Sequence, residues 1–81
     1  MVAKGYTTMD AKVRDATLKV HLSEMQNRLD QAAGIAKAAN ACVDAGNIEK
    51  AIEIALDVEQ LIYEVNTFLN SANLIYRVCK R

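Results

Sequence analysis

The sequence predicts an all-α fold, a long antiparallel helical hairpin that dimerises into a four-helix bundle. Three observations predict this class. The chain has 52% apolar residues and no proline, and much of it consists of strong helix formers such as Ala, Leu, Lys and Glu. Its apolar residues recur with alternating spacings of three and four, which is the period of an amphipathic helix. At 81 residues, the chain has room for one small domain.

The first helix is predicted over residues 8–45. Thr7, followed three residues later by Asp10, has the pattern of a capping box, in which a hydroxyl and a carboxylate satisfy free amide groups of the first turn. Gly34 is the weak point, because glycine inside a helix costs about 1 kcal/mol relative to alanine. We expect a continuous or gently bent helix with Gly34 as a close-packing site. The alternative is a break near residue 34, which gives three helices.

Gly46 and Asn47 are predicted to form the turn of the hairpin. Glycine readily adopts the left-handed conformation that ends a helix, and asparagine commonly caps the helix that follows. The second helix is then expected over residues 48–79. Residues 1–7 precede the first helix and are expected to be flexible, so the single hairpin domain covers residues 8–81.

The sequence around the turn resembles a known helical repeat. Gly46-Asn47-Ile48-Glu49-Lys50-Ala51 is similar to the turn of a tetratricopeptide unit, which favours Gly, then Asn or Asp, an apolar residue and Glu-Lys-Ala. The resemblance covers residues 36–56, within one unit. It implies a well-formed helical-hairpin turn and the binding of a peptide or protein.

Each predicted helix carries an apolar stripe with unbroken three and four spacing. The stripe of the first helix consists of Leu18, Leu22, Met25, Leu29, Ala32, Ala36, Ala39 and Val43. The stripe of the second consists of Ile48, Ala51, Ala55, Val58, Ile62, Val65, Leu69, Ala72, Tyr76 and Cys79. A fold at residues 46–47 brings the stripes together, so we expect them to form the interior of the hairpin.

The second helix has more apolar surface than one partner helix covers. Ile54, Leu61, Phe68 and Ile75 recur every seven residues beside its main stripe, and Tyr63 widens it. Burying each of the first four contributes about 1.5 to 3 kcal/mol. With two chains contributing, this balance favours association over its estimated cost of about 4 to 15 kcal/mol. These five residues are the predicted interface of a homodimer or of a complex with another protein's helices.

Charge is unevenly distributed along the predicted hairpin, although the total is zero. Eight of the ten Lys and Arg lie toward the open end, whereas six of the ten Asp and Glu lie toward the turn. An antiparallel dimer, with its two turns at opposite ends, brings acidic ends beside basic ends. The same charges also fit a solvated helix surface with i,i+4 pairs such as Asp15 and Lys19. The sequence leaves the choice between a parallel and an antiparallel dimer open.

No arrangement of residues in the sequence points to catalysis. His21 is the only histidine, and Cys42 and Cys79 lie far apart in a hairpin, so a zinc site has no local ligand set. A dimerising hairpin resembles the dimerisation domain of histidine kinases, which implies a phosphate-accepting histidine. Those domains have an acidic residue directly after the histidine, where this chain has Leu22. We therefore expect His21 to lie at the edge of the core rather than to accept phosphate. We therefore predict no enzyme activity, no cofactor and no metal.

The segments that direct proteins to membranes or out of the cell are not evident. No apolar run approaches the roughly 18 residues of a membrane helix. Residues 1–8 lack the apolar core of a signal peptide. We therefore expect a cytoplasmic protein.

The expected function is that of a small non-enzymatic protein–protein interaction module (adaptor, chaperone-like or regulatory) that self-associates through its second helix. The alternative is a nucleic-acid-binding hairpin dimer, similar in outline to small plasmid RNA-regulating hairpin proteins. Its contacts would come from the basic open end, at Lys12, Arg14, Lys19, Arg77, Lys80 and Arg81. The zero net charge and the 5% aromatic content argue against nucleic acid as a partner.

Overall fold

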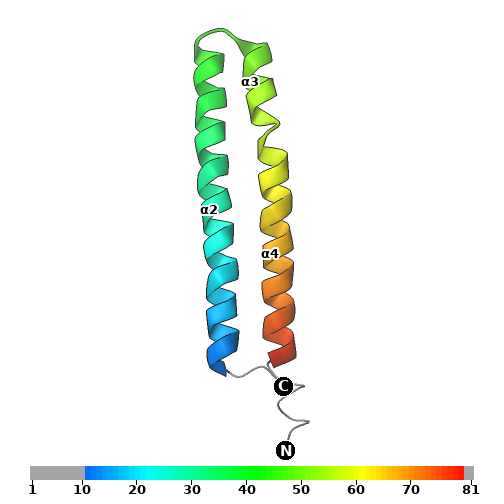
Figure 1. The fold of residues 1–81 in the computed structure, drawn as a ribbon. Coiled ribbons are helices and arrows are strands. Elements are labelled where there is room, and N and C mark those ends of the chain that lie inside the picture. The colour runs from blue at the N-terminus through cyan, green and yellow to red at the C-terminus, as the bar shows by residue number, and fades with distance from the viewer. Residues whose placement is uncertain (1–10, 80–81) are drawn as a thin grey trace, which may run out of the picture.

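The computed structural model describes residues 11–79 of the chain. In this range the structure has three helices, α2 (Ala11–Asp44), α3 (Ile48–Ala55) and α4 (Val58–Cys79), and no strand. Figure 1 shows α2 running along one side of the molecule, with α3 and then α4 returning beside it in the opposite direction. The prediction of an all-α fold is confirmed, while the four-helix bundle stays a prediction for the assembled protein.

Helix α2 is continuous through Gly34, so the alternative of a break there is wrong. A Cβ atom built on Gly34 meets no atom within 4 Å. The expectation that Gly34 is a close-packing site is therefore also wrong, because the residue is exposed on the outside of the hairpin. The predicted cap at Thr7 and Asp10 and the N-terminal segment 1–7 lie outside the described residues.

The turn has the geometry that Gly46 and Asn47 predict. Gly46 has a φ of 83°, in the left-handed region. Its N–H donates to the carbonyl oxygen of Val43 at 2.9 Å, and the N–H of Asn47 donates to that of Cys42 at 2.8 Å, a Schellman arrangement. The side chain of Asn47 accepts from the N–H of Lys50 at 3.1 Å and so caps α3.

The second helix predicted over residues 48–79 is present as α3 and α4, but it is bent at Leu56 and Asp57, so the prediction that it is continuous there is wrong. The N–H of Asp57 donates to the carbonyl of Ile54 at 3.0 Å, and that of Glu59 donates to Leu56 at 3.1 Å. Both bonds span three residues rather than four, which tightens the helix locally. Leu56 keeps right-handed helical angles, so the chain continues from α3 into α4 along the same side of the hairpin (Figure 1). Glu59 in the first turn of α4 favours a new helix start there.

The interior of the hairpin is thin and is lined by small residues. The buried apolar residues are Ala32, Ala39, Ala51 and Ala72, and no large side chain in the described range is fully buried. The two short dimensions of the molecule are 15 and 14 Å, which corresponds to a single layer of helices. Alanine lets two helices approach closely, but large apolar side chains then remain at the edges of the contact.

Each apolar stripe predicted from the sequence is half inside the hairpin and half outside it. The inward half consists of Leu18, Met25, Ala32 and Ala39 in α2 and of Ala51, Val58, Val65, Ala72 and Cys79 in α3 and α4, all buried or half-buried. The seam is completed by other half-buried residues, His21, Arg28, Ile35 and Cys42 on one side and Ile54, Leu61, Phe68 and Ile75 on the other. The expectation that both stripes are wholly interior is wrong, because two helices meet along only two positions in every seven.

Candidate interaction surface

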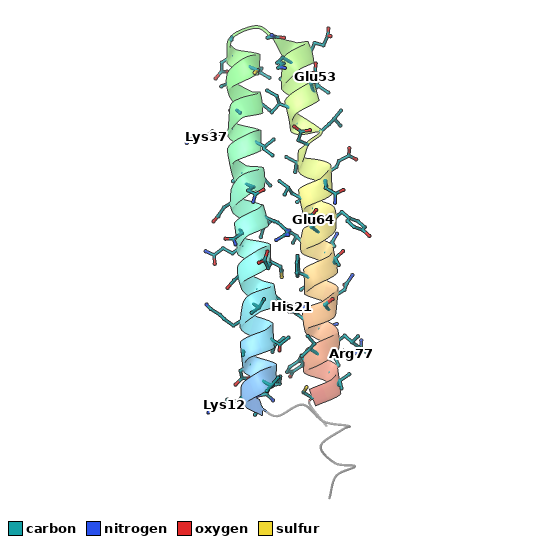
Figure 2. The ribbon with its side chains drawn as sticks, viewed as in Figure 1. Lys12, His21, Lys37, Glu53, Glu64 and Arg77 are labelled. Carbon is teal, nitrogen blue, oxygen red and sulfur yellow. The ribbon has the colours of Figure 1, made fainter. Side chains whose placement is uncertain are left out.

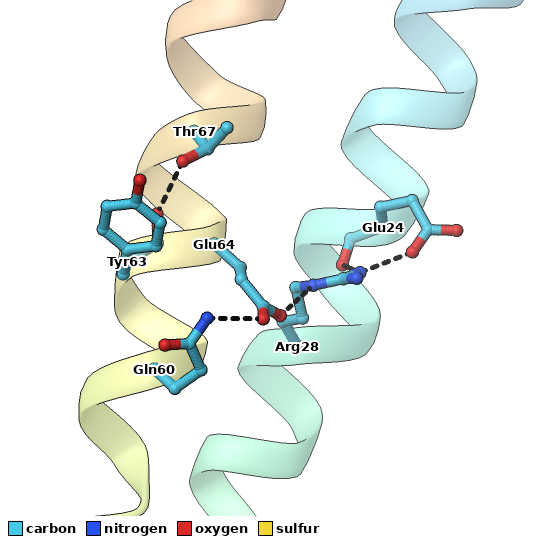
Figure 3. Close-up of polar contacts among 6 residues, drawn as sticks. All are labelled: Glu24, Arg28, Gln60, Tyr63, Glu64 and Thr67. Atoms are coloured by element: carbon cyan, nitrogen blue, oxygen red, sulfur yellow. Dashed lines mark hydrogen bonds and ion pairs between the residues drawn. The ribbon is translucent and has the colours of Figure 1, made fainter.

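One edge of the hairpin is polar and is organised around Arg28. The guanidinium Nε of Arg28 donates to Glu64 of α4 at 2.7 Å, and its Nη1 donates to Glu24 one turn earlier in α2. Gln60 donates to the other oxygen of Glu64 at 2.8 Å. Figure 3 shows these four side chains bridging the two helices on one side. This edge therefore has its polar groups paired within the hairpin.

These contacts shift the pKa values of two groups in the cluster. The pKa of the Glu64 carboxyl is lowered from 4.5, first because Gln60 donates a hydrogen bond to it and second because Arg28 does. The pKa of Arg28 is raised from its ordinary value, first by its hydrogen bond to Glu24 and then by the bond to Glu64. Both shifts favour the charged forms, so the ion pairs persist at neutral pH.

Phe68 of α4 packs between two side chains of α2. The guanidinium carbon of Arg28 lies 4.7 Å from the centroid of its ring, a cation–π contact. The ring of His21 meets Phe68 edge-on, with centroids 5.7 Å apart. Nδ1 of His21 lies 2.9 Å from the carbonyl oxygen of Thr17, so this nitrogen is the donor. His21 is half-buried in these contacts, as an aromatic partner of Phe68.

The opposite edge of the hairpin is apolar along its whole length. Its residues recur every seven positions and are Leu22, Leu29, Ala36 and Val43 in α2 and Ile48, Ala55, Ile62, Leu69 and Tyr76 in α3 and α4. All of these except Ala55 are exposed, and the exposed fraction of the large side chains ranges from 42% for Ile62 to 56% for Ile48. We call these nine residues the apolar face.

The two halves of the apolar face lie on the same side of the hairpin. Each member except Ile48, which follows the cap residue Asn47, directly follows an inward-facing residue, as Leu29 follows Arg28 and Leu69 follows Phe68. Glu24 and Glu64 instead directly precede inward-facing residues, which places them on the other side of the seam in each helix. Because these two carboxylates meet through Arg28, the polar edges of the helices coincide. The apolar edges therefore coincide as well.

The five residues predicted from sequence as the interface do not form one surface. Ile54, Leu61, Phe68 and Ile75 are half-buried along the seam with α2, and Phe68 contacts two of its side chains. Tyr63 is 66% exposed and points away from α2 (Figure 3). Sequence reasoning missed the apolar face because its members share the seven-residue period of the inward residues. The sequence signal that separates the apolar face from the inward-facing residues is the position of Glu24, Arg28 and Glu64. Their charges identify the polar edge, and the apolar face lies on the opposite edge.

The basic residues of the alternative function do not gather on one surface. Arg14 is half-buried and bonds to Asp15 at 2.9 Å, and this hydrogen bond raises the pKa of Arg14. Lys12 and Arg77 lie on different helices, on opposite sides of the hairpin in Figure 2, and Lys19 is exposed on α2. Lys80 and Arg81 lie outside the described residues. This arrangement does not favour nucleic-acid binding, which stays an untested alternative.

The remaining features of the described range offer no other site. Residues 11–79 contain no group of three or more His, Cys, Asp or Glu placed to hold a metal ion. Cys42 and Cys79 are free thiols, one near the turn and the other at the end of α4. An open depression beside the break between α3 and α4 is lined by Ala55, Val58, Glu59, Ile62, Tyr63 and Asn66. It borders the apolar face and is widely open to solvent.

None of the helices in residues 11–79 combines the length and the hydrophobicity needed to cross a bilayer.

Comparisons of the chain with models of protein families, with curated proteins and with solved structures find no match.

Proposed function

We propose that this chain is a non-enzymatic protein–protein interaction module that self-associates into a four-helix bundle through its apolar face. The observation that carries the proposal is a row of large, exposed apolar side chains along both helices, Leu22, Leu29, Val43, Ile48, Ile62, Leu69 and Tyr76. Scattered exposed apolar residues are normal on a monomer, whereas a continuous row of them is typical of an interaction surface. The apolar face takes the place of the interface proposed from sequence, because most of those residues line the seam between the helices.

The width of the apolar pattern supports a bundle. A two-stranded coiled coil needs two apolar positions in every seven, whereas helices of a bundle have three. In α4 these three positions are occupied by Val65, Phe68 and Leu69. The first two are half-buried by α2, and the third is exposed. A second layer of helices is the arrangement that covers this third position.

The balance of free energy also supports association. Fully burying a large aliphatic side chain contributes about 1.5 to 3 kcal/mol. Completing the burial of seven side chains that are about half exposed therefore contributes roughly 5 to 10 kcal/mol per chain. Two chains contribute about twice that, against an estimated association cost of about 4 to 15 kcal/mol.

The mass of the chain in solution, measured by light scattering after size-exclusion chromatography, tests this proposal. We expect about twice the monomer mass of 8.9 kDa. Ile62→Ser combined with Leu69→Ser is expected to halve this mass by placing hydroxyls on the apolar face. The matched control is Val20→Ser with Leu74→Ser, which removes residues that are 58% and 59% exposed but lie off that face. A monomeric wild type, or a dimeric Ile62→Ser/Leu69→Ser variant, contradicts the proposal.

A further inference from the structure

We infer that the apolar face docks onto the apolar face of a second copy of this chain in one orientation, with the two turns at opposite ends of the bundle. This inference rests on the proposed self-association and adds to it the direction and register of the partner. Two independent features of the described residues carry it. One is the order of large and small residues along the apolar face, and the other is the separation of charge along the hairpin.

The apolar face is arranged in levels along the hairpin, counted from the turn at 1.5 Å of rise per residue. Val43 and Ile48 lie within about 5 Å of the turn, Ala36 and Ala55 at about 15 Å, Leu29 and Ile62 at about 25 Å, Leu22 and Leu69 at about 35 Å, and Tyr76 at about 45 Å. The two small residues thus share one level on the turn side of the centre. Two leucines share the corresponding level on the open side.

Docking with the turns at opposite ends pairs small residues with large ones. A two-fold axis at the central level packs α2 against α2 and α4 against α4 of the partner, and it exchanges the 15 Å and 35 Å levels. Ala36 then meets the partner's Leu22, and Ala55 meets the partner's Leu69. Large residues opposite small ones let the two faces interdigitate without gaps.

Docking with both turns at the same end gives the opposite result. This orientation packs α2 against α4 of the partner and keeps every level opposite itself. Ala36 then meets the partner's Ala55, which leaves a gap, and Leu22 meets the partner's Leu69, which crowds the interface. A cavity and an overpacked level both destabilise an interface, so residue size favours the turns at opposite ends.

The charges along the hairpin favour the same orientation. In the described part within about 25 Å of the turn, the acidic residues Asp30, Asp44, Glu49, Glu53, Asp57 and Glu59 outnumber Lys37 and Lys50. In the described part beyond that level, the basic residues Lys12, Arg14, Lys19, Arg28 and Arg77 outnumber Asp15, Glu24 and Glu64. Docking with the two turns at opposite ends places the acidic half of each chain beside the basic half of its partner. The resulting attraction weakens as salt is added.

Exchanging residue sizes within α3 and α4 tests the orientation by sedimentation equilibrium. Ala55→Leu is expected to raise the dimer dissociation constant about tenfold or more, because the larger side chain meets the partner's Leu69. Leu69→Ala is expected to raise it as well, by leaving a cavity. The double variant A55L/L69A restores a large residue opposite a small one. We expect its dissociation constant to lie within about threefold of the wild type, with circular dichroism checking that each variant is helical.

The outcomes separate the orientation from the proposed function. With both turns at one end, A55L fills the gap opposite Ala36 and tightens the dimer, and L69A relieves the crowding opposite Leu22, so the double variant A55L/L69A is tighter than L69A alone. That pattern overturns the orientation and leaves self-association in place. A wild type that is monomeric at every concentration overturns the proposed function and the orientation together.

Disulfide trapping gives a second readout that does not depend on affinity. In a Cys42→Ala/Cys79→Ala background, chains carrying Ile48→Cys are mixed with chains carrying Tyr76→Cys and oxidised. The inferred orientation predicts a cross-linked pair of unlike chains, because the level of Ile48 meets that of the partner's Tyr76. A mixture of Val43→Cys and Ile48→Cys chains is the matched control and is expected to stay uncross-linked. Cross-linking in the control mixture instead overturns the inference.

Discussion

At the scale of single residues, two glycines of the hairpin have opposite effects. Gly46 has a φ of 83°, a conformation that side chains with a Cβ rarely adopt. Gly34 has ordinary helical geometry, and open space surrounds the position of its missing Cβ. One glycine is therefore required by the turn, while the other only weakens α2.

Replacing Gly34 by alanine is expected to raise the free energy of unfolding by about 0.5 to 1 kcal/mol, because alanine loses less backbone entropy on folding. Urea unfolding followed by circular dichroism measures the change. Gly46→Ala is the matched control and is expected to lower the same quantity by about 1 to 2 kcal/mol. A destabilising G34A would show that residue 34 is in close contact in the assembled protein.

Glu64 is expected to make stability depend on pH in the acidic range. Its pKa in the hairpin lies below 4.5 because Gln60 and then Arg28 donate hydrogen bonds to the carboxylate. A carboxyl whose pKa is lowered on folding contributes stability that is fully present above its unfolded pKa and is lost as the pH falls through its folded value.

Thermal unfolding of the wild type and of Glu64→Gln, from neutral pH to below the folded pKa of Glu64, measures this contribution. The wild type is expected to have the higher melting temperature at neutral pH. The difference in melting temperature between the two proteins is expected to narrow below about pH 4.5. A difference that stays constant down to the acid end would show that the charge of Glu64 does not stabilise the hairpin.

At the scale of elements, local chemistry predicts where the chain turns but not how its helices rotate. Gly46 and Asn47 predict the turn because their own conformation and side chain fix it. The break at Leu56 and Asp57 has no glycine or proline to signal it, since it results only from amides shifting to nearer carbonyls. The rest of the second helix follows the predicted boundaries.

The rotation of each helix was harder to predict than its existence. Phe68 and Leu69 belong to apolar series with the same period, so spacing alone does not decide which one faces α2. The choice depends on contacts between distant parts of the chain. Arg28 contacts both Phe68 and Glu64, and this turns the neighbouring Leu69 outward.

Serine substitutions at neighbouring positions of α4 are therefore expected to differ in how much helix they remove. Leu61→Ser with Phe68→Ser is expected to cause a large loss of helical circular dichroism, because both side chains belong to the seam with α2. Ile62→Ser with Leu69→Ser changes the adjacent residues and is expected to lower the mass with a smaller loss of helix at the same chain concentration. Equal losses of helix in the two pairs would contradict the assignment of inward and outward faces.

At the scale of the whole molecule, the described hairpin is a single layer of helices with an alanine-lined interior. Only alanines are buried in the described range, so the large apolar and charged side chains keep exposed surface along the two edges of the hairpin. The separation of charge toward the ends is readable from sequence, because distance from the turn sets the level of each residue. The concentration of apolar residues on one edge and of paired charges on the other becomes visible only in the folded hairpin.

Isotope-filtered NOE spectroscopy on an equimolar mixture of labelled and unlabelled chains tests most directly whether a second copy covers the apolar face. We expect intermolecular NOEs at the methyl groups of Ile62 and Leu69, with Leu69 of one chain close to Ala55 of the other. A helical chain that shows no intermolecular NOE at Ile62 or Leu69 would show that no second copy covers the apolar face.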